Sequence, residues 1–115
     1  MNKDDCVFCR IAAGETGAPV WQDESVVAFH DLSPRAPTHL LIIPREHLES
    51  ADDLTPEHEM LAGRLLTTAA RLAREAGLVN GGYRLVMNTG AGAGQSVFHL
   101  HLHLLAGRPF AWPPG

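Results

Sequence analysis

The chain of 115 residues lacks the features that mark membrane, secreted and nucleic-acid-binding proteins. It has no apolar run of about 18 residues and no charged-then-apolar leader, so we expect neither a transmembrane helix nor a secretory signal. Nine Lys and Arg against thirteen Asp and Glu leave a net charge of -4, and the basic residues form no stripe. This distribution disfavours nucleic-acid binding. We therefore expect a cytoplasmic protein with no nucleic-acid partner and no membrane partner.

Cysteine is scarce, because only Cys6 and Cys9 occur. Two cysteines make a poor disulfide framework, and in a cytosolic protein this spacing is typical of half a metal site or of a redox pair. The redox interpretation is the weaker one, because the stretch before Cys6 is too short for the strand that precedes a thioredoxin-type motif. Both thiols can reach one tetrahedral zinc ion, whose other two ligands would be histidines from elsewhere in the chain.

The sequence shows no internal repeat, and its length is that of one domain. Apolar periodicity predicts a short N-terminal helix over residues 5–13 and a long amphipathic helix over residues 57–76, which begins at Thr55-Pro56 and is ended by Gly77. Apolar runs predict five strands, at residues 20–22, 25–30, 38–44, 83–88 and 96–105. We expect residues 1–115 to form a single α+β domain, in which the long helix covers one face of a mainly antiparallel meander.

The last predicted strand alternates three histidines with three leucines over residues 99–104. Period-two alternation turns the leucines toward the core and all three imidazoles to the other face, about 6.6 Å apart along the strand. A lone histidine on a strand is usually an ordinary core or surface residue. Three in register, behind a loop with Gly90, Gly92 and Gly94, indicate a site, since the amides of such a loop can form an anion-binding nest. The pattern favours phosphate chemistry.

The run His99-Leu-His-Leu-His103-Leu-Leu resembles the histidine triad (HIT) motif, His-φ-His-φ-His-φ-φ with φ apolar, which names a superfamily of nucleotide hydrolases and transferases. Further segments are similar to its Hint branch, namely Phe29-His-Asp-Leu-Ser-Pro34, Ala36-Pro-Thr-His39, Ile43-Pro44, Gly94-Gln-Ser-Val97 and Trp112-Pro-Pro-Gly115. The resemblance covers almost the whole chain. It implies a HIT-like fold and a homodimeric purine nucleoside phosphoramidase, which cleaves the P–N bond between an AMP moiety and an amine.

The resemblance also implies roles for individual residues. His101 would be the nucleophile that forms a nucleotidyl-histidine, and the carbonyl of His99 would accept a hydrogen bond from its Nδ1–H. Neutral imidazole, with a pKa near ~6.5, is a competent nucleophile at pH 7. His103 would bind phosphate oxygens with the amides near Ser96, and the Ser96 hydroxyl would assist the departing nitrogen. The other implied nucleotide contacts are His39 and Asn88 at the phosphate, Asp31 at the ribose, Phe29 and Leu32 at the base, and Gly94 and Gln95 in the loop before the triad.

For some of these residues, a purely structural role remains open. Phe29 and Leu32 would be expected in a core in any case, and Gly92 and Gly94 could serve turn geometry alone.

For the cysteine pair, the resemblance implies a structural zinc ion, bound as in some bacterial-type relatives by Cys6, Cys9, His47 and His99. Such a Cys2His2 set is closed and leaves no open position for water. The alternative is four unliganded residues. The chain departs from the Hint pattern at Ala111, where many relatives carry a histidine before Trp-Pro-Pro-Gly. This puts the leaving-group preference in doubt, including whether acyl-AMP is accepted.

Other functions stay open at this point. In a zinc-dependent hydrolase, a His-x-His pair and His39 would hold a catalytic ion whose bound water attacks. A non-catalytic nucleotide-binding module would keep the scaffold alone. Within the superfamily, the alternatives are dinucleoside polyphosphate hydrolysis and nucleotidyl transfer, which the Trp-Pro-Pro-Gly ending disfavours.

Overall fold

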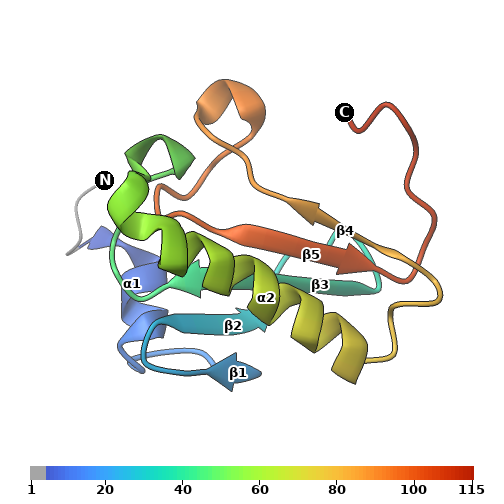
Figure 1. Cartoon of the computed structure of the whole chain (residues 1–115), viewed down its shortest axis with the longest axis horizontal. Helices are drawn as coiled ribbons and strands as arrows, with labels where there is room; N and C mark the ends of the chain where they lie inside the picture. The colour runs from blue at the N-terminus through green and yellow to red at the C-terminus, as the bar shows by residue number, and fades with distance from the viewer. Residues whose placement is uncertain (1–4) are drawn as a thin grey trace.

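A computed structural model describes residues 5–115 of the chain. Five strands form one antiparallel sheet in the order β1 (Trp21–Gln22), β2 (Val26–His30), β3 (Thr38–Pro44), β5 (Leu102–Ala106) and β4 (Tyr83–Val86). The long helix α2 (Glu59–Glu75) crosses one face of this sheet, and the short helix α1 (Val7–Ala12) packs against the other (Figure 1). The predicted α+β class is therefore confirmed. Within residues 5–115, no helix is both long enough and apolar enough to span a bilayer.

The sheet is buried on both faces because successive side chains of its central strands point to opposite sides. On β3, Leu40 and Ile42 join the cluster beneath α2, whereas Leu41 and Ile43 join the cluster that holds α1. Every residue of β3 after Thr38 is buried, as the continuous apolar run of residues 40–43 predicts. The predicted bounds of this strand are those observed.

Helix α2 buries Leu65, Ala69 and Ala73, which are spaced at four residues along one stripe. The predicted start of the helix at Thr55-Pro56 forms a 3-10 turn over Pro56–His58. After the helix ends, the chain turns at Gly77, which has a φ of 72°. His58 accepts a hydrogen bond from the Thr55 amide at 3.0 Å. It therefore caps the turn that precedes α2. Further 3-10 turns lie at Ala51–Asp53 and Ala91–Ala93.

Three predicted features of the sheet are wrong. The strands do not form a meander, because α2 carries the chain from β3 past one strand position to β4, and β5 then fills the gap between them. The fifth strand begins at Leu102 rather than at residue 96. Before that point the backbone bonds elsewhere, since the Leu100 amide donates to the Leu48 carbonyl at 2.7 Å. The leucines of this segment do enter the core beneath α2, but His99 and His101 lie outside the strand. The fourth strand also ends at Val86, two residues short of its predicted bound.

Gly107 lets the chain leave β5 close against the loop between β2 and β3. Its φ is 98°, a conformation that side chains rarely adopt, and a Cβ here would lie 2.7 Å from the Cβ of Pro37. Gly63, in the middle of α2, has no heavy atom within 4 Å of the position that a Cβ would take. The two glycines therefore offer a matched comparison.

We expect Gly107→Ala to lower the free energy of unfolding by about 2–4 kcal/mol, because backbone strain and the clash with Pro37 add. Gly63→Ala should raise it by about 0.5–1 kcal/mol, since alanine is the better helix former. Urea denaturation of both variants measures these changes. A Gly107→Ala protein as stable as the wild type would show that the β5 exit is not held against Pro37.

Candidate active site and metal centre

Three histidines from two distant parts of the chain, His39 and the pair His101 and His103, meet on the sheet face opposite α2. His103 of β5 pairs with Leu41 of β3, so His39 is its diagonal neighbour on the same face. The rings of His39 and His103 lie 5.1 Å apart, and those of His103 and His101 lie 5.0 Å apart. Phe8 of α1 contacts the His101 ring edge to face at 5.2 Å. The histidines thus form a row that starts within the sheet and ends against α1.

The hydrogen bond of His101 fixes which of its nitrogens can react. Its Nδ1 lies 2.7 Å from the carbonyl oxygen of His99, as the family resemblance implies. A carbonyl only accepts hydrogen bonds, so Nδ1 carries the proton and donates it. The Nε2 atom of the neutral ring then keeps its lone pair. His101 is 7% exposed and is held in the tautomer of a nucleophile.

A second chain of hydrogen bonds fixes the opposite tautomer in His103. The backbone amide of Arg35 donates to Nδ1 of His39 at 3.0 Å, so the proton of neutral His39 resides on Nε2. That Nε2 lies 2.8 Å from Nδ1 of His103 and donates to it. The proton of His103 therefore resides on its own Nε2, which is buried and has no partner within residues 5–115. This N–H group can therefore donate a hydrogen bond to a ligand.

Burial keeps these rings uncharged. It lowers the pKa of His103 to about 4, helped by the neighbouring His101 and His39, while the Asp31 carboxylate acts in the opposite direction. Burial also lowers the pKa of His39, which Asp31 opposes from 3.4 Å and Arg35 reinforces. Near pH 7 both rings are neutral, as the tautomer chain requires. The site therefore offers a lone pair on His101 beside an N–H donor on His103.

The other predicted contacts fall into two groups. Asn88 and Ser96 make no side-chain hydrogen bond within residues 5–115, and Leu32 is 97% exposed, so these side chains are available to a ligand. Phe29, in contrast, is buried against Phe8 at a ring distance of 5.4 Å. The Oδ1 atom of Asp31 accepts the Ser33 amide at 2.8 Å.

Gln95 is committed to shaping its own loop. Its Oε1 accepts the Gly90 amide at 2.8 Å, and its Nε2 donates to the carbonyls of Glu49 at 2.6 Å and Val97 at 3.1 Å. Gly94 follows the turn at a φ of 99°, and a Cβ there would lie 3.9 Å from Nδ2 of Asn88. The side chain of Gln95 is thus fully used inside the protein, a role that its place in the sequence does not reveal.

The four residues suggested as metal ligands come together beside the His101 end of the row. Nδ1 of His99 lies 3.3 Å from Sγ of Cys6, 3.4 Å from Sγ of Cys9 and 3.3 Å from Nδ1 of His47. The Cys9 sulfur lies 3.1 Å from Nδ1 of His47. Tetrahedral zinc with bonds of about 2.0–2.3 Å places neighbouring ligand atoms about 3.3–3.8 Å apart. The observed cluster agrees to within about half an ångström.

The orientation of His99 supports this fit. Its Nε2 donates to the Pro44 carbonyl at 2.8 Å, which leaves Nδ1 with a lone pair directed at the cluster. Burial lowers the pKa of His99 to about 4, so this lone pair is retained near pH 7. Two thiol sulfurs and two imidazole nitrogens are a donor set that zinc prefers. The cluster can therefore hold a metal ion.

A second group of possible ligands, Asp31, His39 and His103, differs from the catalytic zinc site considered above. His101 is outside this group, in which the ligand atoms all lie within 4.8 Å of one another. The 2.8 Å between the nitrogens of His39 and His103 is a hydrogen-bond length, shorter than the roughly 3.3 Å between two imidazole ligands of one tetrahedral ion. The arrangement fits a hydrogen-bonded relay.

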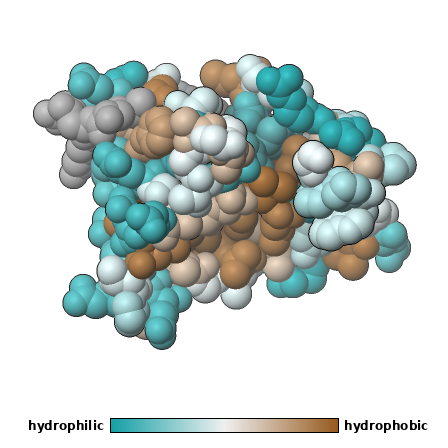
Figure 2. Space-filling view, turned by 90° about the horizontal axis from the view of Figure 1, so that it is seen from above, coloured by the Kyte–Doolittle hydropathy of each residue, from teal (hydrophilic) through white to brown (hydrophobic). Residues whose placement is uncertain are grey.

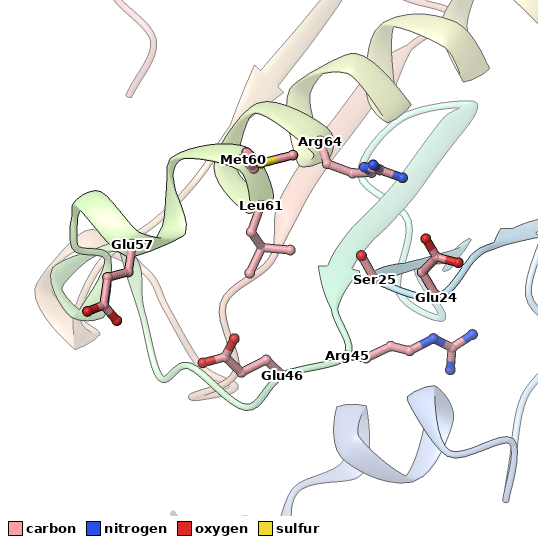
Figure 3. A pocket seen from close by; sticks show the side chains of 8 residues that line it. All are labelled: Glu24, Ser25, Arg45, Glu46, Glu57, Met60, Leu61 and Arg64. Atoms are coloured by element: carbon pink, nitrogen blue, oxygen red, sulfur yellow. The ribbon is translucent and has the colours of Figure 1, made fainter.

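A hollow of about 360 Å³ lies elsewhere, between the start of α2 and the chain around β2 and β3 (Figure 3). It contains none of the histidines, and its lining includes Arg45 and Arg64. Both guanidinium groups hold the protein together, since Arg45 donates to Ala12, Gln22 and Asp23 and Arg64 pairs with Asp23 at 3.3 Å. This hollow offers no activated nucleophile.

Three elements of the site carry no recognisable sequence signal. The Arg35 amide and the Pro44 carbonyl act through the main chain, which any residue other than proline could supply in the first case and any residue in the second. Phe8 lies two positions after Cys6, and its place beside His101 depends on how α1 packs. Only the fold brings these groups to the histidines.

Comparison with known proteins gives one consistent result. The HIT domain family pattern matches residues 15–110. A purine nucleoside phosphoramidase of Escherichia coli (strain K12) is 46% identical over 107 residues, which cover 92% of this chain and 90% of that protein. The crystal structure of a HIT family hydrolase from Legionella pneumophila aligns with a TM-score of 0.94 at 48% identity, covering 96% and 100% of the two chains. A histidine triad protein from Clostridium difficile aligns with a TM-score of 0.91 at 38% identity, covering 96% and 97%.

The depressed pKa of His103 predicts a loss of stability in acid. Between pH 6.5 and about 4 the unfolded chain binds a proton at this residue and the folded chain does not, so the free energy of unfolding falls as the pH is lowered through this range. Urea titrations at several pH values measure the slope. His103→Asn removes the titrating ring, so its slope should be shallower than that of the wild type. Parallel slopes would contradict a neutral, half-buried His103.

Proposed function

The chain belongs to the HIT domain family, and on this premise we propose that it is a hydrolase of the histidine triad type that cleaves the P–N bond of purine nucleoside 5'-phosphoramidates. The observation that carries the proposal is the pair of opposite tautomers in His101 and His103, whose rings lie 5.0 Å apart. One ring offers a lone pair for phosphorus, and the other offers a donor for a phosphoryl oxygen.

In the proposed reaction, Nε2 of His101 attacks the α-phosphorus while the P–N bond breaks. The departing nitrogen keeps the electron pair of the P–N bond and takes a proton from the Ser96 hydroxyl, which solvent water reprotonates, so it leaves as a neutral amine. The attacking ring of His101 becomes positively charged, and its Nδ1–H bond to the His99 carbonyl strengthens as that charge develops. Water then hydrolyses the nucleotidyl-histidine and releases the nucleoside monophosphate.

His103 supplies electrostatic stabilisation in this scheme. Its unpaired Nε2–H would donate to a non-bridging oxygen, where negative charge accumulates in the transition state. His39 acts behind it by holding this tautomer, and the free Asn88 side chain would bind the phosphate as well. Because the donor is oriented before substrate arrives, little reorganisation is needed during the reaction.

The remaining contacts in the proposal concern the nucleoside. The Asp31 carboxylate would accept the ribose hydroxyls, and Phe29 with the exposed Leu32 would flank the base. Gly94 and Gln95 would contribute through the loop that they shape, which precedes the Ser96 amide. Dinucleoside polyphosphate hydrolysis and nucleotidyl transfer use the same kind of nucleotidyl-histidine intermediate. An assay with several substrates therefore identifies the preferred leaving group.

The proposal includes a structural zinc ion held by Cys6, Cys9, His47 and His99. The ion would cross-link α1 to the chain before β5 and would take no part in bond breaking. Its support is the agreement of ligand spacing with a tetrahedral site and the orientation of His99. The zinc-dependent hydrolase is the weaker alternative, because the 2.8 Å between the nitrogens of His39 and His103 is a hydrogen-bond length, too short for two ligands of one ion.

We also propose that the protein is a cytoplasmic homodimer whose sheets join at β4. This strand lies at one edge of the sheet, and within residues 5–115 only β5 pairs with it. Seen from the β4 side, apolar residues extend across the middle of the surface between hydrophilic margins (Figure 2). Tyr83, Leu85, Val86 and Met87 are half-buried apolar residues of this edge. Such a patch at an open strand edge favours association.

Hydrolysis of adenosine 5'-phosphoramidate tests the reaction. We expect His101→Ala to lower kcat by at least about a thousandfold, because it removes the nucleophile. His30→Ala is the matched control, since His30 is exposed on β2 and its side chain points to the α2 side of the sheet. Acid quenching of the wild type during turnover should trap nucleotide covalently bound to protein. An active His101→Ala enzyme would refute the mechanism, and a panel with acyl-AMP and diadenosine polyphosphates identifies the preferred leaving group.

Metal analysis tests the cysteine cluster. We expect about one zinc ion per chain, released by Cys9→Ser together with a lower melting temperature, because a structural site contributes folding energy. Chelated protein that remains folded should keep its turnover. If chelation abolishes turnover while circular dichroism shows intact structure, the ion is catalytic and the proposed mechanism is wrong.

A further inference from the structure

The segment that follows β5 lies against the loop that leads into β3. Gly107 meets Pro37 there, and two atoms of Arg108, Nε at 3.1 Å and Nη2 at 3.0 Å, donate to the Arg35 carbonyl. The planar guanidinium group presents both donors in a fixed geometry, so the carbonyl oxygen is held in place rather than merely contacted. Arg108 itself is exposed and touches none of the proposed catalytic histidines.

The held residue, Arg35, is the one whose amide selects the tautomer of His39. Its carbonyl and its N–H belong to the peptide units on either side of one Cα, and the N–H donates to Nδ1 of His39 at 3.0 Å. Pro34 and Pro37 restrict the same loop. Immobilising the Arg35 carbonyl therefore limits how far the N–H can turn away from His39.

Loss of the hydrogen bond from the Arg35 amide would change the protonation of Nε2 of His103, the atom proposed to bind phosphate. Without the donor on Nδ1, His39 can carry its proton there and use Nε2 as an acceptor. His103 must then donate from Nδ1, and its Nε2 no longer carries a proton. A tautomer change at His39 thus converts Nε2 of His103 from a donor into an acceptor, which repels a phosphoryl oxygen.

We propose that Arg108 is a positioning residue, which holds the Arg35 peptide so that His39 and His103 stay in the tautomers that point an N–H at the phosphate. The proposal deepens the function given above and rests on it for the role of His103. Arg108 forms no contact with substrate in this scheme. It acts from the outer surface through one carbonyl, one amide and one imidazole.

The structure also holds Arg108 in place. Two guanidinium groups lie over the Phe110 ring, with Cζ of Arg108 at 4.4 Å and Cζ of Arg84 at 5.2 Å from its centroid. Arg84 of β4 donates to the Ala111 carbonyl at 2.9 Å. The stack ties the chain after β5 to the sheet edge and reduces the conformational freedom of the Arg108 side chain. Exposed arginines usually lack such support.

The test combines a tautomer measurement with kinetics. Long-range ¹H–¹⁵N correlation spectra assign the protonated nitrogen of each imidazole. The wild type should show His39 and His103 protonated on Nε2, and Arg108→Ala should shift both rings toward the Nδ1-protonated form. With adenosine 5'-phosphoramidate, kcat should fall about tenfold while KM changes less than about twofold, since a transition-state contact is weakened.

Three further variants make the result specific. Arg74→Ala removes an exposed arginine of α2 and should leave spectra and kcat as in the wild type. Arg108→Lys keeps the charge and one donor, so it should recover part of the loss. Phe110→Leu removes the stacked ring and should shift the tautomers in the same direction as Arg108→Ala, to a smaller extent. If Arg108→Ala does not fold, Arg108→Lys and Phe110→Leu replace it in the test.

Unchanged tautomers in Arg108→Ala with kcat within about twofold of the wild type would overturn the proposal. An equal loss in Arg74→Ala would also overturn it, because the effect would then reflect net charge. The spectra require no substrate. A wild type that fails to hydrolyse phosphoramidates would count against the proposed function, while the tautomer shift would still decide the role of Arg108.

Discussion

The hydrogen bond from Nδ1 of His101 to the carbonyl of His99 connects the two centres of this protein. At 2.7 Å it fixes the tautomer of the proposed nucleophile, and its acceptor belongs to the residue whose ring enters the cysteine cluster. The ring of His99 is in turn anchored by the Pro44 carbonyl. The cluster can therefore orient His101 without touching it, because a rigid His99 presents its carbonyl in one direction only.

Reactivity at this site depends on the absence of charge. His39 accepts one hydrogen bond and donates another, so it is satisfied while neutral, whereas His101 only donates and His103 only accepts within residues 5–115. Burial lowers the pKa values of His39 and His103, and the hydrogen-bond chain decides which nitrogen of each of these two rings carries the proton. His103 Nε2 is the end of that chain and its one open donor. The same hydrogen bonds therefore satisfy buried nitrogens of the row and set which nitrogens remain open to a ligand.

Sequence patterns predict the parts of this molecule that repeat along one element. The bounds of β3, the apolar stripe of α2 and the inward leucines of residues 100–104 follow from periodicity. Contacts that compete with periodicity do not. The segment before Leu102 leaves the strand conformation because Gln95, the Leu100 amide and the His99 ring bond to loops around residues 44–49. The relay through the Arg35 amide is likewise invisible, since main-chain donors carry no residue identity.

The short helix α1 lies beside both the histidine row and the cysteine cluster. Its six residues span about 9 Å and cover only part of the sheet face, which leaves the rest of that face to the histidines. A helix this short has almost no stability of its own. Cys6 accepts the Cys9 amide at its first turn, and both cysteines reach the cluster with His47 and His99. Packing of Phe8 and Ala12 against the sheet holds this helix, and the proposed zinc ion would add a cross-link through both cysteines.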